Sequence, residues 1–230
     1  MNVLDYIKVL CWMPLLLLAG QGLAQNQIEQ DTSGSDRVQI DYADETIYLR
    51  QGRVEVQRLV GNVELRQDSI YVYCDSVTIT NDTALVAKGN VIIQQGDSLN
   101  VFADSLEYNT TIKEAHLYGE VVLESGEQRL FTDRLDYDLT TKVATYRNNA
   151  TLTNGPTQLT SKIGYFYVNQ DEAFFKDSVV VVDPEFVLRS DTLQYNTDLS
   201  LATFLGPTLI TNDSTRIRSE EHTSELQSLL

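Results

Sequence analysis

The chain has 230 residues and a formal net charge of −16, with 33 acidic side chains against 17 basic ones. Because binding to nucleic-acid phosphates needs clustered lysine and arginine, this balance argues against a nucleic-acid partner. The length is sufficient for one domain with a sizeable core.

Residues 1–24 have the pattern of a secretory signal peptide. Lys8 precedes an apolar run over residues 9–19, and small residues follow up to Ala24. This pattern predicts an export leader that is cleaved after Ala24. An uncleaved membrane anchor is the alternative, but Pro14 and the shortness of the apolar run disfavour a membrane span.

Residues 38–217 contain a sequence repeat, and the polar residues 25–37 before it are expected to be flexible. Each repeat begins at a Gly-Asn-Val-like turn. The copies begin at Gly61, Gly89, Gly119, Asn148, Asp177 and Gly206. A second anchor reads Asp75-Ser76-Val77, Asp104-Ser105-Leu106, Asp133-Arg134-Leu135, Ser161-Lys162-Ile163 and Asp191-Thr192-Leu193. A period of about 29 residues indicates one supersecondary unit stacked on copies of itself.

Apolar side chains occupy every second position around both anchors, which is the pattern of a strand with one buried face. At the fourth position before the first anchor, alanine stands in four copies, which we interpret as a tightly stacked layer. These alanines are Ala115, Ala144, Ala173 and Ala202. At the Asp anchor the apolar positions change parity, so we predict a bulge or corner there. The pattern therefore predicts an all-β fold with two bent strands per repeat.

The end of the chain departs from the repeat. Residues 218–228 resemble, residue for residue, the translation of a common sequencing-library adapter. We therefore expect residues 218–230 to be an artefactual tail, and the repeat domain 38–217 to be truncated. An acidic tail that belongs to the protein itself is the alternative.

The repeat region contains no recognisable catalytic constellation, so we predict that the protein is not an enzyme and needs no metal or cofactor. His116 has no Cys or His at metal-ligand spacing and is interpreted as a surface strand histidine. Cys74 is expected to fill a small core position. The repeated aspartates favour corner carboxylates that bond their own turns over a Ca²⁺ ladder. Tyrosines at the fourth position after the Asp anchor favour cross-strand packing over a sugar-stacking strip. They are Tyr108, Tyr137, Tyr165 and Tyr195.

An export leader followed by these repeats resembles the OstA-like family, which includes the periplasmic lipopolysaccharide-transport protein A (LptA). The copies that carry the resemblance best are residues 87–93, which read Ala-Lys-Gly-Asn-Val-Ile-Ile, and residues 99–108, which read Leu-Asn-Val-Phe-Ala-Asp-Ser-Leu-Glu-Tyr. The resemblance covers residues 38–217. Repeats four to six depart from it, because they lose the Gly-Asn-Val sequence.

The resemblance implies a half-open antiparallel β-jelly roll (β-taco) that holds the lipid A acyl chains of lipopolysaccharide in an apolar trough. It also implies a periplasmic location, with association with the outer membrane as a further option. Partners would be transport-bridge proteins of the same fold, paired end to end, or other copies of this chain. The chain would be the bridge itself, an enlarged variant of it, or the periplasmic domain of an outer-membrane translocon. The implied trough lining is Val63, Leu65, Val72, Val91, Ile93, Val101, Val121, Leu123, Leu130, Leu152, Val179 and Val181.

Three other interpretations remain open at this stage. The same lining residues would equally form a closed, dry core. An exported structural or adhesive β-solenoid would have such a sealed interior and would not bind lipid. A polysaccharide-active β-helix enzyme would need clustered carboxylates or basic residues on one face.

Overall fold

A computed structural model describes residues 38–96, 99–170, 172–196, 199, 201–212, 214–219 and 224–226. The predicted signal peptide, the segment 25–37 and most of the predicted tail lie outside these residues. Within them the chain forms one sheet of 17 strands and a single 3₁₀ turn, η1 (Val168–Gln170). Every strand pairing is antiparallel, which confirms the predicted all-β class.

The strands follow one another with short turns between most of them. The first eight are β1 (Gln39–Tyr42), β2 (Glu45–Gln51), β3 (Val54–Gln67), β4 (Ile70–Thr80), β5 (Ala84–Gln95), β6 (Leu99–Asn109), β7 (Glu114–Ser125) and β8 (Gln128–Asp138). The others are β9 (Val143–Tyr146), β10 (Ala150–Asn154), β11 (Thr157–Ser161), β12 (Ile163–Tyr167), β13 (Glu172–Val182), β14 (Val187–Asn196), β15 (Leu201–Thr211), β16 (Arg216–Ser219) and β17 (Ser224–Leu226). Strand β16 extends into the predicted tail, and β17 lies within it.

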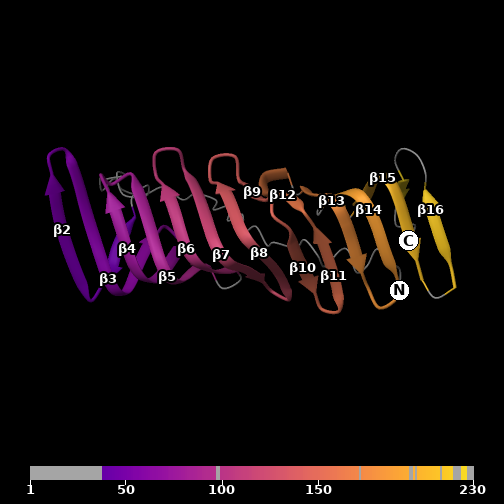
Figure 1. The fold of residues 1–230 in the computed structure, drawn as a ribbon, viewed down its shortest axis with the longest axis horizontal. Helices are drawn as coiled ribbons and strands as arrows, with labels where there is room; N and C mark the ends of the chain where they lie inside the picture. The colour runs from indigo at the N-terminus through magenta and orange to yellow at the C-terminus, as the bar shows by residue number, and fades with distance from the viewer. Residues whose placement is uncertain are drawn as a thin grey trace, which may run out of the picture.

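The sheet grows sideways in chain order from β2 to β16 (Figure 1). Strand β8 pairs through its first half with β10 and through its second half with β9. Strand β9 then pairs with β12 and β10 with β11, and both β11 and β12 pair with β13. Strands β9 and β10 therefore replace one bent strand, and β11 and β12 replace the next. The arrangement of two bent strands per repeat persists through the fourth repeat.

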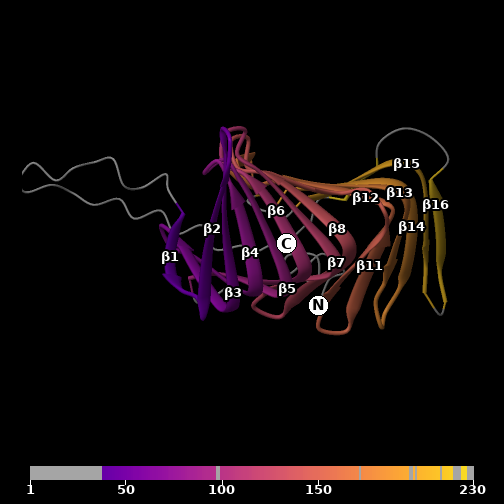
Figure 2. The same ribbon diagram turned by 60° about the vertical axis from the view of Figure 1, so that its left-hand side comes forward.

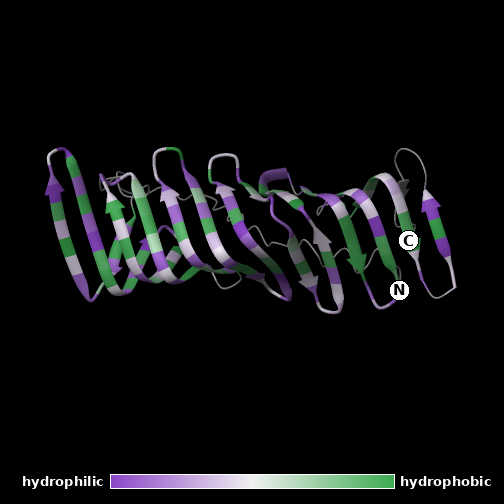
Figure 3. Ribbon diagram, viewed as in Figure 1, coloured by the Kyte–Doolittle hydropathy of each residue, from purple (hydrophilic) through white to green (hydrophobic). Residues whose placement is uncertain are grey.

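The long strands fold over near their middles, so the sheet has two arms (Figure 2). We call the half that contains β9 and β12 the first arm, and the half that contains β10 and β11 the second arm. Hydrophobic and hydrophilic residues alternate along the strands (Figure 3). The buried hydrophobic side chains of both arms belong to one cluster, so the core lies on the inner face, between the arms.

A pair of left-handed residues forms the corner of most odd-numbered strands. Gly89 and Asn90 in β5 have φ angles of 79° and 47°, and Gly61 and Asn62 in β3 have 78° and 45°. The pairing register shifts at this point on both sides of β5. Such a bulge bends the strand and changes which residues face inward. Glycine at the first position avoids the steric cost of a Cβ at positive φ, and asparagine tolerates the second.

The Asp anchor lies against the corner of the following strand rather than against its own turn, so the sequence-based interpretation of its partner was wrong. Asn90 Nδ2 donates a 2.9 Å hydrogen bond to Asp75 Oδ2, and a Cβ on Gly89 would overlap the Asp75 carboxylate. Asp104 occupies the same place beside Gly119. This contact, which we call the corner latch, requires glycine for a second reason, the close approach of the carboxylate.

The structure corrects the position of the fourth Asp anchor by one residue. Gly164 pairs with Tyr146 and Phe175, which puts Gly164 in the row of Leu135 and Leu193 and makes Lys162 the equivalent of aspartate. Lys162 Nζ lies 2.9 Å from Asp177 Oδ2, and Asp177 stands where other repeats have glycine. In this repeat an ion pair between lysine and aspartate thus replaces the contact between aspartate and glycine that joins the strands elsewhere.

We predict that Gly89→Ala destabilises the fold more than Gly126→Ala. Gly126 lies in a turn with φ of 58° and nothing within 4 Å of its Cβ position, so its substitution adds only backbone strain of about 1–2 kcal/mol. Gly89→Ala adds the overlap with Asp75, for a further loss of about 1–3 kcal/mol. Urea unfolding measures both. Combining Gly89→Ala with Asp75→Ala is expected to cost less than the sum of the single changes. Equal losses in the two glycine variants would contradict the latch.

Candidate functional site

An uninterrupted row of aliphatic side chains crosses the inner face of the second arm. Each member is directly opposite the next across the pairing registers, and each lies two positions along its strand from the row nearest the corner. The row is Ile40, Leu65, Val72, Ile93, Val101, Leu123, Leu130, Leu152, Leu159, Val181, Leu188, Ile210 and Ile217. Because direct cross-strand neighbours pack side by side, these residues form one continuous apolar band.

Aromatic and alanine side chains alternate on the inner face of the first arm. Ala115 pairs with Tyr108 on one side and Tyr137 on the other, and Ala173 pairs in the same way with Phe166 and Tyr195. The small side chain leaves room for the rings on both neighbouring strands. Of the predicted alanine layer, Ala173 and Ala202 are buried, whereas Ala115 and Ala144 are half-buried.

The fourth member of the predicted tyrosine series is again displaced by one residue. Phe166, not Tyr165, lies on the inner face, where its ring makes an edge contact with Phe175 at 5.6 Å between centroids. Tyr165 lies on the outer face. Tyr146 also enters this inner aromatic group, and Gly164 opposite it is small because a Cβ there would overlap the Tyr146 ring.

The predicted lining residues all lie on the inner face, in two rows at different depths. Val63, Val91, Val121 and Val179 lie beside the corner and are at most 1% exposed. The others belong to the aliphatic row. Of these, Leu65, Val101, Leu130, Leu152 and Val181 are buried, and Val72, Ile93 and Leu123 are half-buried. The corner valines therefore form a packed floor, and the half-buried residues are the accessible part of the band.

Several members of the aliphatic row were not predicted from the sequence, and of these Leu159 and Leu188 are almost fully buried. A signal for them exists, because positions 72, 101, 130, 159 and 188 follow one another at a constant interval. The same interval separates Asp75, Asp104, Asp133, Lys162 and Asp191. The even-numbered strands thus keep a stricter period than the Gly turns.

Polar side chains are buried at the tip of the second arm, beyond the aliphatic row. Thr157 Oγ1 donates a 2.6 Å hydrogen bond to Asp183 Oδ2, and both residues are at most 5% exposed. Asp183 also accepts a hydrogen bond of 3.0 Å from the backbone N–H of Glu185. These bonds satisfy the carboxylate away from solvent. The apolar band therefore has a polar border at this tip.

The inner rows reach solvent at both ends of the described sheet. Tyr48 on β2 pairs with Gln57 and belongs with it to the inner face of the first arm, yet Tyr48 is 74% exposed. Ile40 and Ile217, the outermost members of the aliphatic row, are 38% and 58% exposed. The apolar band is therefore accessible at both edges of the described sheet.

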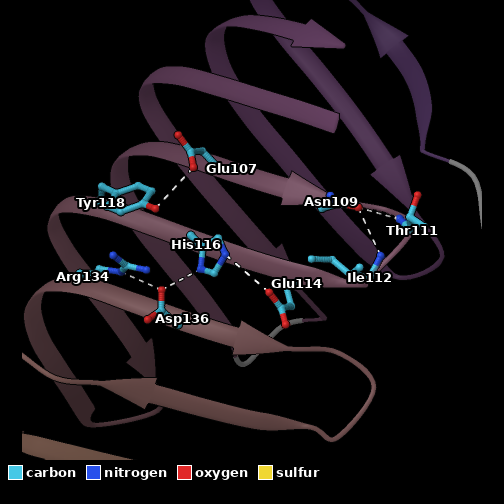
Figure 4. Close-up of polar contacts among 9 residues, drawn as sticks. All are labelled: Glu107, Asn109, Thr111, Ile112, Glu114, His116, Tyr118, Arg134 and Asp136. Carbon is cyan, nitrogen blue, oxygen red and sulfur yellow. Dashed lines mark hydrogen bonds and ion pairs between the residues drawn. The ribbon is translucent and has the colours of Figure 1, made fainter. Parts of the chain in front are cut away.

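His116 belongs to a polar cluster on the outer face of the first arm (Figure 4). Its Nδ1 lies 2.7 Å from Asp136 Oδ1, which also accepts a 2.8 Å bond from Arg134 Nε. The Arg134 guanidinium lies over the Tyr118 ring, 5.0 Å from its centroid. Within the described ranges, no group of three or more His, Cys, Asp or Glu side chains is arranged to hold a metal ion. The cluster is a hydrogen-bonded surface network on neighbouring strands.

Cys74 lies in the corner row of the second arm, directly opposite Val63. It is 5% exposed, and its Sγ lies 3.5 Å from the carbonyl oxygen of Ser76. Burial raises the pKa of the Cys74 thiol to about 11. The predicted core role of this cysteine agrees with this environment, and the neutral thiol is poorly nucleophilic at physiological pH.

In the part of the chain that the structure describes, no helix has the length and hydropathy needed to cross a membrane.

The repeat region is similar in sequence to a known family of proteins. The sequence profile of OstA-like proteins matches residues 35–191. No curated protein matches the chain. The solved structures that match include the crystal structure of LptH from Pseudomonas aeruginosa, described as the LptA homologous periplasmic component of the conserved lipopolysaccharide transport device. It is 17% identical with a TM-score of 0.43, over 56% of this chain and 94% of that one.

We predict that Cys74 resists alkylation in the folded protein. With a pKa of about 11, its thiolate fraction at pH 8 is about a hundredfold below that of an ordinary cysteine, and burial slows access further. Iodoacetamide labelling followed by peptide mass spectrometry measures the rate at Cys74 itself. The same reaction in guanidinium chloride provides the control, where labelling is expected to be fast. Equal rates in the folded and unfolded protein would contradict the corner packing.

Proposed function

Since the chain belongs to the OstA-like protein family, we propose that it is a periplasmic component of lipopolysaccharide transport. Its inner face carries the acyl chains of lipid A between the two arms. The sugars and phosphates of the same molecule remain outside. The protein itself performs no covalent chemistry in this role, because transfer of a lipid along an apolar band needs only burial and release.

The continuity of the aliphatic row is the observation that supports this function most. A sealed core needs matched volumes, whereas a path for an alkyl chain needs an apolar surface without polar interruption. On each strand of the second arm, from Ile40 in β1 to Ile217 in β16, the residue at this position is aliphatic. Each buried methylene of an acyl chain contributes about 0.8 kcal/mol, so burial of several methylene groups against this row suffices for stable binding.

Accessibility along the band supports entry of the lipid from the side. Val72, Ile93 and Leu123 are half-buried, whereas the corner valines below them are inaccessible. We propose that acyl chains first contact the half-buried residues, and that the floor stays packed. The predicted lining residues are thereby divided into an accessible wall and a structural floor.

The exposed ends of the band support partners of the same fold. A neighbouring domain, whether a transport-bridge protein or a second copy of this chain, would pair with an end strand and continue the aliphatic row. The exposed side chain of Ile40, at the β1 end of the row, would then be covered. We propose export through the signal peptide 1–24 and a periplasmic location, with association with the outer membrane as one form of the assembly.

A structural or adhesive role remains the second candidate, and one observation favours it. Tyr73, Phe102 and Phe131 recur at the repeat interval on the outer face of the second arm, with Ile92 and Val122 between them in register. Phe131 is 40% exposed. An outward apolar strip of this kind is expected for a protein that adheres through its surface, and lipid binding would be absent.

Photo-crosslinking to lipopolysaccharide distinguishes the two roles. A photoreactive residue at Ile93 or Leu123 is expected to crosslink to the lipid, because both side chains face the trough and are half-buried. The matched controls are Ile92 and Val122, which are adjacent, half-buried and directed outward. Crosslinks at the inner pair alone support transport. Crosslinks at neither pair would favour the structural role, and crosslinks at the outer pair alone would contradict the assigned trough.

We further predict that Ile93→Asp weakens lipopolysaccharide binding by about tenfold or more, whereas Ile92→Asp leaves it unchanged. A carboxylate at Ile93 would have to be desolvated by the acyl chain, at a cost of about 2 kcal/mol or more. Both sites are half-buried, so both variants are expected to fold, which circular dichroism checks. Titration with a fluorescent lipopolysaccharide measures the affinity. Equal weakening by both variants would contradict the assigned faces.

A further inference from the structure

A group of aromatic rings and cations occupies the outer face of the first arm, where β12 and β13 lie side by side (Figure 1). Its members are Arg147, Tyr165, Tyr167, Phe174 and Lys176, which we call the aromatic–cation patch. Tyr165 stacks against Tyr167 at 6.4 Å between ring centroids, and Tyr167 meets Phe174 edge-on at 5.7 Å. The patch lies on the opposite face of the sheet from the aliphatic row and does not contribute to the trough.

Two cations are held against the same ring. The Arg147 guanidinium and the Lys176 ammonium each lie 5.6 Å from the Tyr165 centroid. Arg147 Nη1 also donates a 3.3 Å hydrogen bond to the Tyr165 hydroxyl, and Lys176 lies 5.7 Å from the Phe174 centroid. Cation–π contacts hold the two charges in place without neutralising them.

The nearby carboxylates are already engaged by other partners. Asp177 pairs with Lys162, and Asp136 bonds His116 and Arg134. Glu172 accepts a hydrogen bond from Gln194. Among the described residues, no carboxylate lies within ion-pair distance of Arg147 or Lys176. Within the described part of the chain, Arg147 and Lys176 thus have no paired carboxylate, although Glu172, directly opposite Tyr167, keeps its charge beside its neutral partner Gln194. Two unpaired positive charges in a chain with a net charge of −16 favour an anion.

We infer that the aromatic–cation patch is a binding site for a phosphorylated saccharide. A phosphate group accepts hydrogen bonds from guanidinium and ammonium groups, which are among the strongest in proteins. The half-buried rings of Tyr165, Tyr167 and Phe174 beside these charges offer an apolar platform for the C–H face of a sugar. The shared chemistry is a sugar phosphate, whether it is free or the headgroup of a lipid. The inference does not depend on the trough.

Titration with glucose 6-phosphate, followed by amide chemical shifts, tests the site. We expect shifts that centre on β12 and β13, and weaker binding of glucose and of inorganic phosphate, which each lack one part of the recognition. The variant Arg147→Ala/Lys176→Ala is expected to bind about ten- to a hundredfold more weakly, since it loses two charge-assisted hydrogen bonds. Lys88→Ala is the control, because it removes an exposed lysine on another strand, β5, and binding is expected to be unchanged.

The folded state of the double variant is checked by its amide spectrum, and Tyr165→Phe provides a second, milder change. It keeps the ring and the cation–π contacts but loses the hydroxyl, so a several-fold weakening is expected. The inference is overturned if glucose 6-phosphate does not bind, if the folded double variant binds it as well as the parent, or if inorganic phosphate binds equally well.

Two further titrations separate the sources of the sugar phosphate. Lipopolysaccharide is added to Ile93→Asp, in which the trough is impaired, with and without the patch substitutions. A loss of residual binding that depends on Arg147 and Lys176 identifies a lipid headgroup as a ligand of the patch. Binding of glucose 6-phosphate together with the absence of such residual binding identifies a free sugar phosphate. Absence of lipopolysaccharide crosslinks at Ile93 and Leu123 would count against the proposed transport function and leave the patch supported.

Discussion

The fold depends on the corner latch, in which a charged or carboxylate-bearing residue of one strand rests against the left-handed corner of the next. Without a bend, strands of this length would form one flat, two-sided sheet whose apolar face could not be covered by the chain itself. At the bulge, the inward-facing residues of strands such as β4 and β6 are at odd-numbered positions on one side of the corner and at even-numbered positions on the other. Two apolar rows on one strand are thereby turned towards each other, and the sheet provides its own second layer.

The latch also explains which sequence changes the repeat accepts. Gly89 admits Asp75 because no Cβ is present, and the asparagine that follows donates to the carboxylate. In the fourth repeat the carboxylate side becomes Lys162, and the glycine side becomes Asp177 with a φ of 62°. Both partners change together, so the attraction between the strands survives the loss of the glycine. The repeat persists along the chain as an interaction between two positions rather than as a fixed residue at each.

Much of this architecture follows from the sequence, because period, parity and turn residues agree in the first three repeats. The fourth repeat escaped the pattern for a physical reason. Ile163 and Tyr165 on the outer face are as apolar as Phe166 on the inner face, and the inner position between them is Gly164. Alternation therefore indicates the wrong face. The constant interval that places Lys162 in the aspartate series and the size match between Gly164 and Tyr146 indicate the true register.

The sequence could not separate the floor of the trough from its wall either. Val121 and Leu123 follow the same pattern along their strand, yet Val121 is buried and Leu123 is half-buried. Their burial is decided by packing between the two arms. Alternation along one strand encodes which face a side chain occupies, but not how deeply the opposite arm covers it.

Because each latch joins the last strand of one repeat to the first strand of the next, the molecule can be lengthened in whole units. A duplicated repeat unit brings its own carboxylate and its own corner, and it would dock on either neighbour in phase. Each unit adds two strands, or about 10 Å, to the long axis and leaves the cross-section unchanged. The length of the domain is therefore set by the number of tandem repeats that the gene encodes. Slippage by a fraction of a unit would misalign every corner beyond it, so natural length variants of this domain should differ by multiples of the period.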